Sequence, residues 1–295
     1  MPTLPSSMIP SETDANSVSS SGWSVSIQRR FAVLAIAFGL VMASGCSSLA
    51  QMERSVVFQP ARYPDGNWRP ADAMFEEASF TSSDGTQLHG WYFPCENRRA
   101  TILYCHGNGG NVAYWASAAR QIRDRVGSSV LVFDYRGYGR SEGQPTETGI
   151  LDDARAARLW LARREGIPER QIVLLGRSLG GGVAVDLAAT DGARALILES
   201  TFTSIPDVAQ TMFPLLPMRW LMETRFDSKA KIENYHGPLL QSHGTDDRTI
   251  PYAIGRRLFD SANEPKQFLP IPGGDHNDPP REAYYRVLSA FLDTI

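Results

Sequence analysis

Short apolar segments alternate with segments of helical periodicity from Ser79 to the C-terminus. The segment Ile172–Leu175 shows the pattern, because all its residues are apolar, as in a strand whose sheet is covered by helices on both faces. Strands and helices that alternate in this way form a mostly parallel sheet. The pattern therefore predicts an α/β fold, in which ligands bind beyond the carboxyl ends of the strands. The expected strands are Leu88–Phe93, Ala100–Cys105, Val130–Phe133, Ile172–Leu175, Ala195–Leu198, Leu239–Ser242 and Lys266–Ile271, and the expected helices are Val112–Val126, Gly149–Glu165, Leu179–Ala189, Ala253–Ala262 and Arg281–Leu292.

The composition narrows the classes of function. With 295 residues, of which 42% are hydrophobic and 21% charged, the chain has the size of one globular catalytic domain. A formal net charge of -3 and the lack of any run of Lys and Arg argue against nucleic acid as a partner. Five histidines and three cysteines, without CxxC or HxxxH spacing, do not form the pattern of a metal site.

The N-terminal part differs in kind from the rest. Residues 1–28 are rich in Ser, Thr and Pro and are predicted to be a disordered leader. In the segment 29–46, two arginines precede the apolar run Phe31–Ala43. At about 1.5 Å per residue this run is too short to cross the roughly 30 Å of bilayer hydrocarbon. A short apolar run behind positive charge is typical of a secretory signal.

The apolar run ends in Ala43-Ser44-Gly45-Cys46, which resembles the lipobox of bacterial lipoproteins. The resemblance implies that Cys46 is lipidated and becomes the mature N-terminus. The membrane would then be a partner through this lipid anchor, and the protein would lie in the bacterial cell envelope, facing the periplasm or the exterior. An ordinary cleaved signal, or a short anchor that lies against the membrane, is the alternative interpretation.

Cys95 and Cys105 are the two remaining cysteines. Each ends a predicted strand, and if the two strands run in opposite directions the cysteines lie at opposite ends of the sheet. A disulfide requires Cα atoms within about 7 Å of each other. Both are therefore expected to be free thiols.

The pentapeptide Gly176-Arg177-Ser178-Leu179-Gly180 follows a predicted buried strand and opens a predicted helix. This is G-x-S-x-G in the strand–turn–helix context of a nucleophilic serine. A serine presented on so sharp a turn leaves no room for Cβ atoms two positions to either side, which explains the glycines. The motif predicts that Ser178 is a catalytic nucleophile.

A serine hydroxyl is a weak nucleophile and needs a base that an acid orients. With a G-x-S-x-G serine, the order along the chain is serine, acid, histidine. Of the three histidines after Ser178, His276 lies in a glycine-containing loop after the last strand and is the expected base. His243 ends a strand, where a structural hydrogen bond is expected, and His236 precedes Gly237-Pro238 in an expected turn.

The acid is expected in the segment that follows the penultimate strand. Asp246 and Asp247 both lie there, and Asp247 is the preferred candidate. Asp246 remains an alternative, as does Glu199, which also ends a predicted strand.

The oxyanion hole needs two backbone amides. One is expected from Leu179, the residue after the nucleophile, and the other from the glycine-rich loop His106–Asn111. The amide of Asn108 is the preferred second donor, with Gly107 as the alternative, and a plain turn at His106-Gly107 is the interpretation without function.

Four motifs together resemble one branch of the alpha/beta-hydrolase family, the small and often membrane-associated ABHD-type serine hydrolases and their bacterial relatives. The resemblance spans roughly Phe58 to the C-terminus. It implies an eight-stranded sheet with an antiparallel second strand, a triad of Ser178, Asp247 and His276, and no cofactor. Members of the branch are described as esterases, as thioesterases acting on acylated proteins, or as lipid hydrolases. The motifs are Asp134–Gly143, Gly176–Gly181, Glu199–Ser204 and His243–Asp247.

Two segments outside these motifs have an expected role. The loop Asp134–Gly143 is interpreted as a rigid turn beneath the oxyanion loop, without a part in proton transfer. The segment 201–236 is interpreted as a cap insertion, whose Met, Phe and Trp side chains line an acyl pocket, pack the cap to the body or face a membrane. The expected domain boundaries are a linker at 47–78 and a hydrolase domain at 79–295.

The sequence thus predicts a serine hydrolase that cleaves a carboxylic ester or thioester with an apolar acyl group, through an acyl-serine intermediate. A serine peptidase is an alternative, because the same machinery cleaves amides. A non-catalytic, surface-tethered binding protein on the same fold is another. The oligomeric state is not predicted.

Overall fold

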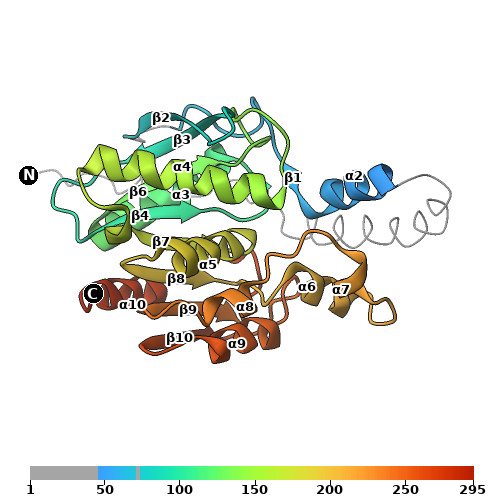
Figure 1. The fold of residues 1–295 in the computed structure, drawn as a ribbon. Helices are drawn as coiled ribbons and strands as arrows, with labels where there is room; N and C mark the ends of the chain where they lie inside the picture. The colour runs from blue at the N-terminus through green and yellow to red at the C-terminus, as the bar shows by residue number, and fades with distance from the viewer. Residues whose placement is uncertain (1–45, 71–73) are drawn as a thin grey trace, which may run out of the picture. The chain divides into compact units, whose positions relative to one another are not determined.

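Eight strands form one sheet in the order β10-β9-β8-β7-β4-β6-β3-β2 in the computed structural model, which describes residues 46–70 and 74–295 (Figure 1). Neighbouring strands are parallel except at β3, which is antiparallel to both β2 and β6. The predicted α/β fold and the antiparallel second strand of the sheet are therefore confirmed. The strands are β2 (Glu76–Thr81), β3 (Gln87–Phe93), β4 (Ala100–Cys105), β6 (Ser128–Asp134), β7 (Val173–Arg177), β8 (Ala195–Glu199), β9 (Leu239–Gly244) and β10 (Lys266–Ile271).

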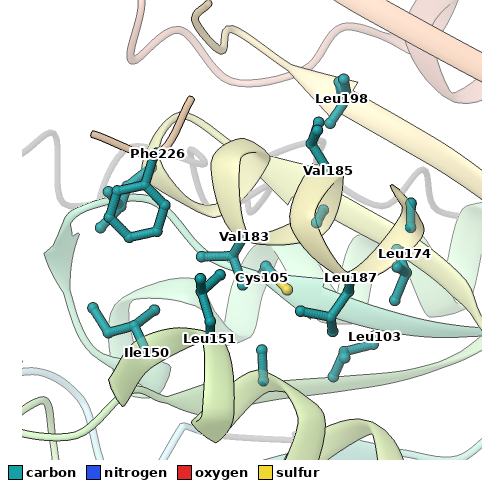
Figure 2. Close-up of a cluster of buried hydrophobic side chains, with 14 of the residues drawn as sticks. Leu103, Cys105, Ile150, Leu151, Leu174, Val183, Val185, Leu187, Leu198 and Phe226 are labelled. Atoms are coloured by element: carbon teal, nitrogen blue, oxygen red, sulfur yellow. The ribbon is translucent and has the colours of Figure 1, made fainter. Parts of the chain in front are cut away.

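Helices cover both faces of this sheet, as the continuously apolar strands require (Figure 1). Alternate residues of one strand point to opposite faces, so Ile102 and Tyr104 pack with α3 and α10, whereas Leu103 and Cys105 pack with α4 and α5. Figure 2 shows part of the second cluster, with Leu103 and Cys105 beside side chains of α4 and α5. The helices are α3 (Val112–Ile122), α4 (Glu147–Glu165), α5 (Leu179–Asp191), α9 (Tyr252–Ser261) and α10 (Glu282–Leu292).

Most expected elements agree with the structure to within a few residues. The expected helix Val112–Val126 is shorter, because α3 ends at Ile122 and a π-helical turn, Arg123–Gly127, follows. Gly127 has φ 69°, a left-handed conformation that glycine adopts readily and that ends the helical stretch.

The stretch expected as a linker, 47–78, holds regular structure. It contains all of the helix α2 (Cys46–Val57) except the first residue of that helix. It also contains the short strand β1 (Gln59–Pro60), which pairs with β5 (Gly109–Gly110). Phe58 is only 2% exposed and contacts Phe226 edge to face. This part of the chain belongs to the same compact unit as the sheet.

The expected cap, 201–236, divides into two parts with different surroundings. The helix α8 (Ser228–Ile232) packs against α5 and α9 and so belongs to the helical layer of the sheet. The helices α6 (Ile205–Met212) and α7 (Met218–Leu221) pack against each other. Leu215 lies between these two helices and is 95% exposed, and Trp220 lies in α7 and is 89% exposed. These two side chains therefore line no pocket.

The expectation of free thiols is confirmed, since Cys95 and Cys105 form no disulfide. The expected leader 1–28, the apolar run Phe31–Ala43 and the rest of the signal segment before Cys46 lie outside the described residues. Within the part of the chain that is described, no helix combines the length and the apolar character needed to cross a bilayer.

Candidate active site

Ser178 stands on the turn that joins β7 to α5. Its backbone has φ 53° and ψ -119°, a conformation that costs a residue with a side chain about 1–3 kcal/mol. Two hydrogen bonds hold the turn in this conformation: the Ser178 amide donates to the carbonyl of Glu199 at 2.9 Å, and the hydroxyl of Thr201 donates to the Ser178 carbonyl at 2.8 Å. In this backbone conformation the Ser178 side chain points out of the turn.

The glycines around Ser178 are required by close backbone packing. A Cβ on Gly176 would lie 2.3 Å from the carbonyl oxygen of Gly180, and one on Gly180 would lie 1.9 Å from that of Cys105. A Cβ on Gly181 would lie 2.1 Å from the hydroxyl of Thr201. The G-x-S-x-G spacing therefore has the steric cause that the sequence predicts.

His276 comes within hydrogen-bond distance of the serine from a position 98 residues further along the chain. Its Nε2 lies 3.1 Å from Ser178 Oγ, and its Nδ1 lies 2.8 Å from Asp247 Oδ2. His276 is held in the loop after β10, where its amide donates to the carboxylate of Asp275 at 2.8 Å. The three residues expected to form a triad thus form one continuous hydrogen-bonded chain.

Asp247 is buried in the turn after β9, where two amides fix its carboxylate. Its Oδ1 accepts from the amides of Thr249 at 2.9 Å and Ile250 at 2.7 Å. Burial alone would raise the pKa of Asp247, but hydrogen bonds from His243, His276 and the Ile250 amide outweigh it and hold the pKa well below its usual range. A carboxylate with a lowered pKa in the folded state stabilises the fold above about pH 3.9, and this contribution disappears as the pH falls.

The alternative acids are placed elsewhere. Asp246 is exposed and accepts a hydrogen bond from the hydroxyl of Thr245 at 3.0 Å. Glu199 is buried beside Arg177 and accepts a short hydrogen bond from the hydroxyl of Tyr284. It is Asp247 that lies against His276, so neither alternative occupies the position of the orienting acid.

The other two histidines after Ser178 differ from each other. His236 is exposed in the turn before β9. His243, near the end of β9, is fully buried, and its Nε2 lies 2.9 Å from the carbonyl oxygen of Ile250 and 3.2 Å from Asp247 Oδ2. The expected structural hydrogen bond is the one to the Ile250 carbonyl. The sequence did not indicate the additional contact with Asp247.

Arg177 is a site residue that the sequence analysis missed. Its Nη2 donates to the backbone carbonyl of His276 at 2.8 Å, and its Nη1 lies 3.5 Å from a carboxylate oxygen of Glu199. The guanidinium also lies over the ring of Trp115, 5.8 Å from its centroid. The available signal was a charged residue between a buried strand and a buried helix, a position that a charge occupies only with partners.

Replacing Arg177 by methionine is expected to destabilise the fold by about 3–5 kcal/mol, because Glu199 would remain as a buried charge without its cation. Chemical denaturation measures the loss. The double variant Arg177→Met/Glu199→Gln removes both charges and should recover much of it. Equal stability of the single and double variants would show that the ion pair is not what holds this region.

The expected oxyanion loop lies close to the serine. A Cβ on Gly107 would be 3.6 Å from Ser178 Cβ. The amide of Leu179 opens α5, where the first N–H groups of a helix have no partner within the helix. Three bonds fix the Asn108 side chain: Oδ1 accepts from the Gln59 amide at 3.1 Å and the Tyr138 hydroxyl at 2.9 Å, and Nδ2 donates to the carbonyl of Val57. The Asn108 side chain is thus fixed in the loop whose Gly107 lies beside Ser178, and the Leu179 amide starts the helix after it.

The loop Asp134–Gly143 supports the oxyanion loop from below, in agreement with its interpretation as scaffold. The Tyr135 hydroxyl donates to the carbonyl of His106 at 2.9 Å, and the Asp134 carboxylate accepts from the amide of Val112 at 2.8 Å. Arg136 pairs with the buried Asp153 at 2.7 Å.

Residues 46–70 and 74–295 contain no cluster of His, Cys, Asp and Glu side chains that would hold a metal ion.

Comparisons with known proteins point to one family. Residues 100–232 match the family model described as alpha/beta hydrolase fold. An uncharacterized Mycobacterium tuberculosis protein, Rv2307c, is 35% identical over 258 residues, which cover 86% of this chain and 92% of that protein. The alpha/beta hydrolase domain-containing protein WAV2 of Arabidopsis thaliana is 32% identical over 288 residues, which cover 87% of this chain and 92% of WAV2.

Among solved structures, the Pyrococcus furiosus esterase Pf2001 superposes with a TM-score of 0.63. The match covers 80% of this chain and 99% of the esterase, at 20% sequence identity. At that identity the likeness concerns the fold.

Proposed function

Because this chain belongs to the alpha/beta-hydrolase family, we propose that it is a serine hydrolase that cleaves a carboxylic ester or thioester through an acyl-serine intermediate. One observation carries the proposal: Ser178 Oγ, the His276 imidazole and the Asp247 carboxylate are linked by distances of 3.1 and 2.8 Å. This is the geometry that a serine needs to become a nucleophile.

The proposed cycle uses each group in turn. His276 Nε2 takes the proton of Ser178 as Oγ attacks the carbonyl carbon, and Asp247 stabilises the imidazolium that results. The amides of Leu179 and Asn108 donate to the oxyanion of the tetrahedral intermediate. His276 then gives the proton to the leaving alcohol or thiol, and water repeats the sequence to release the acid and restore the Ser178 hydroxyl.

An apolar acyl group is the proposed substrate feature. Support comes from α6 and α7, where the side chains of Ile205, Val208 and Met218 are only partly buried against the core and so keep apolar surface that an acyl chain can contact. The solved relative Pf2001 is described as an esterase. We expect p-nitrophenyl esters and acyl thioesters of increasing chain length to be hydrolysed, and matched anilides to be poor substrates.

Labelling with a fluorophosphonate probe tests the proposal directly. An activated serine attacks the phosphorus of the probe and displaces fluoride, so the intact protein should be labelled and the Ser178→Ala variant should not. Ser83→Ala is a suitable control, since it removes an exposed serine in the turn between β2 and β3 and should be labelled like the wild type. A folded wild-type protein that is neither labelled nor active on any ester would contradict the proposal.

We also propose that Cys46 carries the lipid anchor and that the enzyme acts at the bacterial cell envelope. The support is the Ala43-Ser44-Gly45-Cys46 motif and the apolar run before it. Metabolic labelling with a palmitate analogue in a bacterial host tests this. The label should be incorporated by the wild-type chain and lost in Cys46→Ser, and an equally labelled Cys46→Ser would sink the idea.

A further inference from the structure

His243 is a buried histidine that the proposed mechanism does not use. It lies on β9 with no exposed surface, and its ring meets that of Tyr252 edge to face, with the centroids 5.9 Å apart. On the other side, a Cβ added to Gly255 would lie 2.1 Å from its Nδ1. The neighbouring residues of α9 therefore leave the imidazole a single orientation.

The hydrogen bonds of His243 fix its tautomer. Nε2 lies 2.9 Å from the carbonyl oxygen of Ile250, which can only accept, so Nε2 carries the hydrogen. Nδ1 is buried and has no hydrogen-bond partner among the described residues, so a proton there would have no acceptor. The only group that His243 offers to its surroundings is therefore one N–H donor, at Nε2.

The same nitrogen also lies close to the carboxylate of Asp247, so its one hydrogen, which is bonded to the Ile250 carbonyl, attracts this carboxylate electrostatically. Nε2 lies 3.2 Å from Asp247 Oδ2, the same oxygen that accepts from His276 Nδ1 at 2.8 Å. The amide of Ile250 donates to the other oxygen, Oδ1, at 2.7 Å. His243, Ile250 and Asp247 thus form a closed ring of contacts, in which His243 bonds the carbonyl of the residue whose amide donates to the Asp247 carboxylate.

We propose that His243 is a positioning residue for the triad: its Nε2, which is bonded to the Ile250 carbonyl and lies 3.2 Å from Asp247 Oδ2, keeps that carboxylate at the place where His276 Nδ1 must find it. This inference rests on the proposed function, since it concerns the same site. His243 touches neither Ser178 nor the reacting atoms and acts only through Asp247. An error of about 1 Å in the position of a reacting group costs up to roughly 10²-fold in rate, so the effect belongs in turnover rather than in substrate binding.

The test compares two variants at position 243 with the wild type, all as the full-length protein. His243→Leu removes the donor and should lower kcat for a p-nitrophenyl ester by about 10–100-fold, with KM nearly unchanged. In His243→Gln the amide nitrogen restores a donor near the position of Nε2, so kcat should return to within about fivefold of the wild type. The labelling rate with the fluorophosphonate probe should follow kcat in each case.

Gln241→Leu is the matched control. Gln241 is also a fully buried polar residue of β9 that lies against α9, but its side chain donates to the carbonyl of Gly255 at 2.7 Å and not to a triad residue. The variant should lose thermal stability to a similar degree and keep kcat within about twofold. Equal losses of kcat in His243→Leu and Gln241→Leu, or a His243→Gln variant as slow as His243→Leu, would overturn the proposal.

Gly255→Ala gives a second, steric test in case His243→Leu does not fold. Alanine is the better helix residue, but its Cβ would displace the His243 ring. A fall of about tenfold in kcat with KM unchanged is expected, and an unchanged kcat would count against the positioning role.

The Ser178→Ala variant separates a failure of the proposed function from a failure of this inference. If Ser178→Ala stays active, the proposed function itself fails. If Ser178→Ala is inactive and His243→Leu has the kcat of the wild type, only the positioning role of His243 fails.

Discussion

The Ser178→Ala variant is expected to lower kcat for p-nitrophenyl esters by about 10⁵–10⁶-fold, because the acyl-serine intermediate can no longer form. Nothing else at the site can take the place of Oγ. The residual rate would come from the oxyanion amides and substrate binding alone. Single-turnover kinetics on the purified variant measures it, and a loss below tenfold would mean that another residue attacks the substrate.

Stability provides an independent check on the same residue. Ser178 and an alanine in its place share the strained backbone with φ 53°, whereas glycine adopts that conformation without a Cβ penalty. Ser178→Gly should therefore be more stable than Ser178→Ala by about 1 kcal/mol, although both are inactive. If alanine proves the more stable of the two, the backbone strain assigned to this turn is wrong.

The second large effect is expected for Asp247→Asn, which should lower kcat by about 10⁴-fold. Two amides donate to Oδ1, so the oxygen of an asparagine must take that position. Its NH₂ group then faces His276 Nδ1 and donates to it. His276 would be forced to carry its proton on Nε2, toward Ser178, and could not accept the serine proton.

The neighbouring Asp246→Asn variant is the matched control for this prediction. Asp246 is exposed and its carboxylate accepts a hydrogen bond from the hydroxyl of Thr245, so kcat should stay within about twofold of the wild type. The pH dependence of kcat/KM for both variants, measured between pH 5 and pH 9, separates a tautomer effect from unfolding, and circular dichroism checks the fold. Should Asp246→Asn be the slow variant, the acid has been assigned to the wrong carboxylate.

The central elements of the fold could be predicted because their causes are local. The strand at Ile172–Leu175 is continuously apolar, and the glycines beside Ser178 follow from one turn. The candidate base follows from the order of residues in the motifs, and the choice of Asp247 over Asp246 agrees with the distances. In each case a few adjacent residues carry the information.

The roles of Arg177 and His243 could not be predicted, because their partners lie elsewhere. Arg177 binds a carbonyl 99 residues away, and the contact of His243 with Asp247 depends on a turn that brings residue 247 back against residue 243. Leu215 and Trp220 could not be placed either, because an apolar side chain of the segment 201–236 is compatible with a pocket, with packing against the body or with a membrane face; both are exposed in the structure. Sequence composition gives the chemistry of a side chain but not the neighbour that it meets.

The same limit applies to α2 and β1, whose residues gave no strand or helix signal strong enough to separate them from a linker. Their contacts run to distant parts of the chain: Glu53 accepts hydrogen bonds from the amides of Glu223 and Thr224, and Gln59 donates to Asn108.

These contacts determine the shortest piece of the protein that can work. A fragment that starts at Ser79 would keep nearly the whole sheet and all three triad residues, but it would lose the backbone groups of Val57 and Gln59 that hold the Asn108 side chain. It would also leave the volume of the Phe58 ring empty within the core. The minimal catalytic fragment therefore has to begin about thirty residues upstream of the sheet, at or before the helix that starts at Cys46.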